Sequence, residues 1–73
     1  MNNDLIRKLD EIERKIVKII MYSNDIRSLL EFLEEIGRKK LVEKAKNINT
    51  LEDLHIWMGE VLNELRKIRE AKT

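Results

Sequence analysis

The sequence predicts an all-α protein, because apolar residues recur along it at alternating steps of four and three. One such row of Leu and Ile runs through the first half of the chain, and another runs through the last third. This spacing keeps apolar side chains on one side of a helix and is typical of coiled coils and helical bundles. No segment shows the strict alternation of apolar and polar residues that a half-buried strand requires. We therefore expect helices that pack against helices.

The first row predicts one long helix from about Asp4 to Ile36. Its members are Leu5, Leu9, Ile12, Ile16, Ile19, Ser23, Ile26, Leu30 and Leu33. The Ser23-Asn24-Asp25 segment consists of poor helix formers that are good caps, so a break near 23–25 is the alternative. The heptad phase passes through Ser23 without a slip, and on that ground the sequence favours one continuous helix.

A short connecting helix is predicted over 39–46. Gly37 ends the helix before it, because glycine adopts the left-handed backbone conformation freely. The apolar face of the short helix consists of Leu41, Val42 and Ala45. Eight residues form little more than two turns, so this helix offers little cover to its neighbours.

The last helix is predicted over 51–71. Thr50 is placed to cap its N-terminus, with Asp53 three residues further on. Its apolar row consists of Leu51, Leu54, Met58, Val61, Leu65 and Ile68. We expect this helix to fold back antiparallel on the first as a helical hairpin, with the two apolar rows in contact, in a single domain spanning 1–73.

The size of the chain favours a homodimer. A domain of 73 residues buries only about 60% of its unfolded surface, and natural proteins this small usually add disulfides, a metal or a partner subunit. The chain has no cysteine, which excludes disulfides and thiolate metal sites. We therefore expect two hairpins to pair into a four-helix-bundle-like homodimer.

Apolar residues outside the two rows are expected to lie between the subunits. A monomeric hairpin would leave several of them partly in water, and Met and aromatic side chains are typical of interface cores. Glycine inside a helix costs about 1 kcal/mol relative to alanine, which a close crossing by another helix would explain. The expected interface residues are Val17, Ile20, Met21, Tyr22, Ile56, Trp57 and Gly59. The alternative is that the short helix covers this patch within one chain.

The charge balance does not indicate a general nucleic-acid binder. Fifteen Lys and Arg against 14 Asp and Glu give a net charge of +1, without the large basic excess of such proteins. One basic cluster is nevertheless present on and before the short helix, and acidic neighbours dilute it. Its members are Arg38, Lys39, Lys40, Lys44 and Lys46.

Two segments, the first of which includes part of this cluster, resemble helix-hairpin-helix DNA-binding domains. They are Ile36-Gly37-Arg38-Lys39-Lys40-Leu41 and Ile48-Asn49-Thr50-Leu51-Glu52-Asp53-Leu54. The resemblance covers about nineteen residues and implies phosphate contacts by the basic cluster. It lacks the glycine–hydrophobic–glycine hairpin that approaches the phosphates in such domains.

Catalytic and metal-binding motifs are weak, so we expect no enzyme activity, metal or cofactor. His55 is the single histidine, and it forms a Glu-x-x-His pattern with Glu52 as in di-iron bundles. Both positions lie off the apolar row, whereas ligands in those bundles point into the core. The two glycines form no phosphate-binding loop.

Composition and hydropathy suggest the setting of the protein. Charged residues make up 40% of the chain, and Cys and Pro are absent, which resembles the bias of heat-loving organisms. Neither a signal peptide nor a membrane-length apolar run is apparent, so we expect a cytoplasmic protein that does not bind membranes.

The leading functional hypothesis is a non-enzymatic, oligomerising helical adaptor that presents helical faces to a macromolecular partner. The alternative is a small nucleic-acid-binding regulator that uses the basic 38–46 segment on phosphates.

Overall fold

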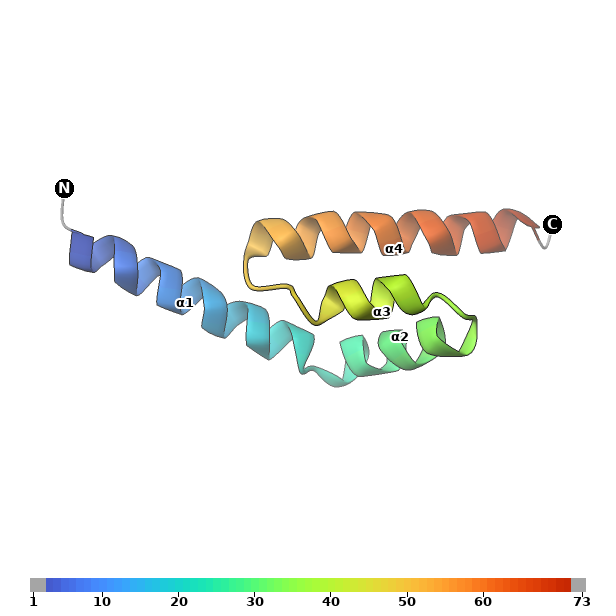
Figure 1. Cartoon of the computed structure of the whole chain (residues 1–73), viewed down its shortest axis with the longest axis horizontal. Helices are drawn as coiled ribbons and strands as arrows, with labels where there is room; N and C mark the ends of the chain where they lie inside the picture. Colours follow the sequence, from blue (N-terminus) through green and yellow to red (C-terminus); the bar gives the residue numbers. More distant parts are fainter. Residues whose placement is uncertain (1–2, 72–73) are drawn as a thin grey trace.

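The computed structural model describes residues 3–71, which are helical apart from short connections. The helices in this stretch of the chain are α1 (Asn3–Met21), α2 (Asn24–Glu35), α3 (Lys39–Ala45) and α4 (Leu51–Ala71). The all-α fold class predicted from the sequence is confirmed. In Figure 1, α2 and α4 run in one direction with α3 between them in the opposite direction, while α1 projects away from these three helices.

The first helix is broken, so the continuity favoured by the heptad phase was wrong. Ser23 separates α1 from α2 and has an extended backbone, with φ −67° and ψ 156°. Its hydroxyl donates to the carbonyl oxygen of Ile20 at 2.6 Å and accepts from the N–H of Ile26 at 3.4 Å. One side chain therefore serves the end of α1 and the start of α2. Such local hydrogen bonds compete with the helical ladder and are independent of heptad phase.

Gly37 reverses the chain between α2 and α3. It has φ +81°, and the N–H groups of Gly37 and Arg38 donate to the carbonyl oxygens of Glu34 and Leu33, at 3.1 and 2.8 Å. These two bonds form a Schellman motif, which glycine enters without steric cost. A Cβ built on Gly37 would meet nothing within 4 Å, so the backbone conformation and not crowding requires glycine here.

The expected hairpin between the first and last helices is not the arrangement within this chain. Because the chain reverses once after α2 and again after α3, α4 runs in the direction of α2 (Figure 1). The helix that lies antiparallel to α4 is therefore the seven-residue α3 and not the long first helix that was predicted there.

The core lies between α2, α3 and α4 and is extended by the C-terminal half of α1. Its buried members are Val17, Ile26, Leu33, Leu41, Ala45, Leu54, Trp57 and Val61. Trp57 is 2% exposed, and its indole N–H donates to the carbonyl oxygen of Leu41 at 2.8 Å. The short helix α3 thus covers the largest core side chain and satisfies its polar atom.

Two residues expected between subunits belong instead to the core of the single chain. Val17 and Trp57 are almost fully buried, and Ile20 and Met21 pack partly against the same core. Helix length is a poor measure of the cover that α3 provides, because Trp57 is 2% exposed beside it. A tryptophan that lies under one helical turn and bonds to its backbone needs only a short helix above it.

The apolar row of α1 shows the opposite error. Leu9, Ile12, Ile16 and Ile19 were expected in the core, but each is exposed to solvent. The break at Ser23 explains this, since α1 packs through the face that contains Val17. In α2 the same heptad row turns inward. The row therefore passes from solvent into the core at Ser23.

Replacing Trp57 with alanine should unfold most of the chain. Large-to-small changes at buried aromatic positions cost about 3–5 kcal/mol, which is most of the stability of a domain this small. Far-UV circular dichroism during urea titration measures the loss. Ile56→Ala is the matched control, because Ile56 is adjacent and exposed. Equal effects of the two substitutions would contradict the placement of Trp57 in the core.

Candidate interaction surfaces

The chain is much more extended than a compact domain of its size. Its radius of gyration is 15.1 Å and its dimensions are 54 × 20 × 17 Å, whereas a compact 73-residue domain has a radius of gyration of about 11 Å. The excess comes from α1, whose N-terminal half lies away from the body formed by α2, α3 and α4 (Figure 1). Much of α1 therefore has no neighbouring helix among residues 3–71.

The exposed side of α1 is apolar along its whole length. We call this surface the α1 stripe, and it consists of Leu5, Leu9, Ile12, Ile16 and Ile19. These five side chains are between 41% and 72% exposed, and Ile6 beside them is 42% exposed. Single exposed leucines are ordinary on protein surfaces, but a contiguous row of this kind marks an interaction site.

The flank of α1 that is attached to the body lies about 100° around the helix from the α1 stripe. Val17 is buried there, and the Glu13 carboxylate accepts a hydrogen bond from the N–H of Leu51 at 3.0 Å. A carboxylate is favourable at this position, because the first N–H groups of α4 have no partner inside the helix. Thr50 completes the cap by accepting from the N–H of Asp53 at 3.0 Å. These contacts fix which side of α1 remains free.

On α4, the flank turned away from α3 is also apolar. Glu60 and Glu64 mark the α3 side, since they pair with α3 and with the residue before it. At 100° per residue, Leu62 lies some 160° around the helix from both of them. The apolar side chains on this flank are Leu51, Met58, Leu62 and Leu65, of which Leu51 and Leu62 are exposed.

On α2 as well, the flank turned away from α3 is apolar. Leu30 marks its α3 side, because it lines a pocket together with Val42 and Ala45 of α3. Leu29, Phe32 and Ile36 lie on the other flank by helical spacing, and Phe32 is 42% exposed.

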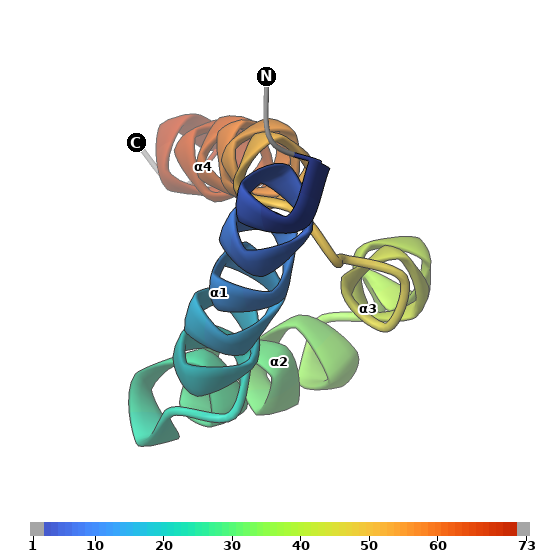
Figure 2. The same ribbon diagram turned by 90° about the vertical axis from the view of Figure 1, so that its left-hand side faces the viewer.

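These flanks lie on one side of the molecule. Figure 2 shows α3 to one side of α2 and α4, with α1 crossing in front of them on the other side. In Figure 1 most of α1 lies beyond the end of the body, so along most of α2 and α4 no described helix lies on that side. Arg14 and Lys18, which line a pocket with Ile48 and Asn49 after α3, place the polar side of α1 toward the α3–α4 connection. The α1 stripe is therefore turned away from α3 as well. We call the α1 stripe and the apolar flanks of α2 and α4 together the open face.

The remaining expected interface residues stay on the surface. Tyr22 and Ile56 are both more than half exposed, and Gly59 is exposed. A Cβ on Gly59 would meet nothing within 4 Å, so no close contact within the described chain requires glycine there. Ile56 and Gly59 line a shallow hollow with Leu62 on the outer side of α4.

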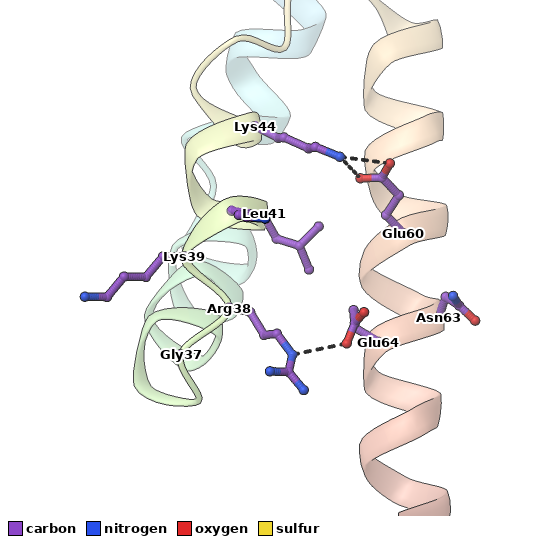
Figure 3. Close-up of a pocket in the computed structure, with 9 residues that line it drawn as sticks. Gly37, Arg38, Lys39, Leu41, Lys44, Glu60, Asn63 and Glu64 are labelled. Atoms are coloured by element: carbon purple, nitrogen blue, oxygen red, sulfur yellow. Dashed lines mark hydrogen bonds and ion pairs between the residues drawn. The ribbon is translucent and has the colours of Figure 1, made fainter.

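The basic cluster is divided by ion pairs. Arg38 Nε lies 3.1 Å from Glu64 Oε2, and Lys44 Nζ lies 3.1 Å from Glu60 Oε2. Figure 3 shows these pairs bridging α3 and α4 across an open pocket of about 600 Å³, while Lys39 points away from α4. Lys46 adds a longer contact, 3.8 Å from Glu43. The five cations therefore do not form one continuous basic surface.

The structure gives no support for a metal centre in residues 3–71. His55 and Glu52 are exposed on α4, and no group of three His, Asp or Glu side chains in this stretch of the chain could hold a metal ion. Within the same residues, every helix is too short or too polar to cross a bilayer.

Comparisons with protein-family models, curated proteins and solved structures found no match to this chain. Function is therefore inferred from the exposed surfaces described above, and chiefly from the open face.

The ion pairs between α3 and α4 should contribute little to stability. Lys44 and Glu60 are both substantially exposed, and exposed pairs contribute about 0.2–1 kcal/mol. Glu60→Gln should lower the free energy of unfolding within that range at low salt. The difference should vanish in about 1 M salt, where the Debye length is only ~3 Å. Urea titration at both salt concentrations measures this, with Glu31→Gln on the exposed side of α2 as the control. A loss that persists at high salt would contradict a surface pair.

Proposed function

We propose that this protein is a non-enzymatic helical interaction module that self-associates through the open face. The observation that carries the proposal is the α1 stripe, five Leu and Ile side chains that are between 41% and 72% exposed. In the associated state these side chains are buried between copies. The polar outer surfaces of the helices remain available to a macromolecular partner, and each copy presents the same set.

The energy at stake supports this proposal. Full burial of a Leu or Ile side chain is worth roughly 1.5–3 kcal/mol, so five half-exposed ones leave on the order of 5 kcal/mol unused. The stability of a 73-residue domain is itself only about 4–11 kcal/mol. Self-association can therefore add an amount comparable with the stability of the isolated chain. A dimer held in this way is also the usual solution for a small domain without disulfides or metal.

The test is the solution mass by size-exclusion chromatography with light scattering at several protein concentrations. The expected mass is twice the 8.8 kDa of the chain. Ile12→Glu, which places a charge in the middle of the α1 stripe, should give the monomer mass with helicity retained. Arg7→Glu is the control, because Arg7 lies on the other side of α1, and this variant should remain a dimer. A wild-type monomer at all concentrations would refute the proposal.

A nucleic-acid-binding regulator is the second candidate. It is supported by Lys39, which points away from the carboxylates that pair with Arg38 and Lys44 (Figure 3). Lys40, the next residue, is exposed as well. The mixed charge around both lysines makes this candidate weaker than self-association.

Binding isotherms with duplex and single-stranded probes at two salt concentrations test this candidate. Phosphate contacts would give an affinity that falls steeply with salt, and Lys39→Ala with Lys40→Ala would flatten that dependence. We expect no binding at low salt, because acidic neighbours surround the cluster. Tight, salt-dependent binding that needs both lysines would overturn this expectation.

A further inference from the structure

The open face also indicates how two copies meet, an inference that rests on the proposed function. The body has α3 on one side of α2 and α4 (Figure 2), and by helical spacing their apolar flanks lie on the other. We call these flanks the α2–α4 flank, which consists of Leu29, Phe32, Ile36, Leu51, Met58, Leu62 and Leu65. We infer that α1 of a second copy docks on the α2–α4 flank, and that the two copies exchange α1 reciprocally about a twofold axis.

The direction of the helices fits this arrangement. Within one chain α1, α2 and α4 all run the same way along the long axis (Figure 1). A twofold axis perpendicular to the long axis reverses the direction of the partner's α1. That helix then runs opposite to α2 and α4, as α3 does. Each half of the dimer becomes a bundle of four helices in which neighbours around the bundle are antiparallel. This is the up-and-down order of simple four-helix bundles.

The dimensions agree as well. With 19 residues in α1 and 21 in α4, the two helices are about 28 and 31 Å long at 1.5 Å per residue. The projecting helix α1, which we call the arm, and the body together span the 54 Å length of the molecule. A twofold axis near the midpoint of this length places the arm of each copy on the body of the other. One side of the molecule, 54 Å long and 20 Å wide, sets an upper limit on the order of 1000 Å² for the contact area of each copy. This limit exceeds the ~800 Å² that each partner buries in a typical stable interface.

Charge favours this pairing over contact between the two copies of α1. Lys8 and Lys15 border one edge of the α1 stripe, whereas α2 has four acidic residues and one basic residue. In the antiparallel order with Lys8 level with Glu35 of the second copy, Lys15 lies about 5 Å along α2 from Asp25, a distance that a lysine side chain can span. If two α1 helices paired in parallel, Lys8 would instead meet Glu13, whose carboxylate already accepts from the N–H of Leu51. The acidic α2 is therefore the better complement to the lysine edge.

The partner's α1, and not the chain's own, is available to this flank. Tyr22 and Ser23 alone connect α1 to α2, and Val17 and Glu13 hold α1 against the start of α4. For α1 to fold back on its own body, Val17 would have to leave the core and the Glu13–Leu51 bond would have to break. Docking between copies retains both contacts.

Disulfide cross-linking tests the arrangement, because the natural chain contains no cysteine. The variant Lys8→Cys/Glu35→Cys places one thiol on each of the two edges that should meet. Both positions are exposed, so folding should be preserved, and circular dichroism checks it. On oxidation at a concentration where the wild type is dimeric, most of the chain should become covalent dimer.

The matched control is Arg7→Cys/Glu34→Cys. Each of its cysteines lies one residue earlier and is therefore turned about 100° around its helix, away from the contact. We expect at least tenfold slower dimer formation than with Lys8→Cys/Glu35→Cys. Lys8→Cys alone should not cross-link, because the two copies of Lys8 lie at opposite ends of the dimer.

Three results would overturn the inference, and a fourth would remove its basis. An internal disulfide in a monomer of Lys8→Cys/Glu35→Cys would mean that the chain's own α1 folds back. Rapid cross-linking of Lys8→Cys alone would mean that α1 pairs with α1. A wild-type dimer whose double-cysteine variant fails to cross-link would refute this docking and leave the proposed function standing. A wild-type monomer would refute the proposed function itself.

Discussion

The hydrogen bonds of one hydroxyl group decide the arrangement of this protein. Ser23 bonds back to α1 and forward to α2, and it divides what the apolar row would otherwise make a single helix. Because the two helices meet at an angle, the row faces solvent in α1 and the core in α2. Every feature considered for function depends on this division, including the projecting arm, the exposed stripe and the bundle with one uncovered side.

The second constraint is the burial of Trp57. A tryptophan in a domain this small needs cover on all sides and a partner for its indole N–H. α3 supplies part of the cover, since Leu41 and Ala45 belong to the same core cluster, and the Leu41 carbonyl oxygen accepts from the indole N–H. The two ion pairs between α3 and α4 lie at the rim of this contact and add little energy. Because α3 packs on one side of α2 and α4, their other flank is left partly exposed, and Trp57 thus determines which side of the body is open.

Much of the fold could be predicted from residue patterns, and the errors have physical causes. Gly37, the short helix and the start of the last helix follow from local rules, because capping and left-handed glycine depend on a few adjacent residues. The break at Ser23 could not be decided by periodicity, since heptad phase describes which residues share a face and not whether the backbone ladder continues. The sequence does contain the signal, three consecutive cap-forming residues, but the heptad phase outweighed it.

The candidate site shows a different kind of error. Heptad phase separated the apolar residues into a core set and a surplus set that was expected between subunits. In the structure, Val17 and Trp57 of the surplus set are buried within one chain, whereas the α1 row of the expected core set is exposed. Patterns reveal how much apolar surface a chain must bury, but only the tertiary arrangement determines how much of that surface a single copy can bury alone, and where.

This distribution has a consequence for the stability of the protein. Association that buries the α1 stripe adds its free energy to that of folding, so the apparent stability depends on protein concentration. The arm contributes one buried residue, Val17, to the described core, and α2 to α4 contribute the rest. In the isolated chain, α1 is therefore the element with the fewest buried contacts, and local opening should begin there. In a dimer that covers the stripe, the same helix lies at the centre of the interface. Folding of the arm and recognition of the second copy are then one physical event.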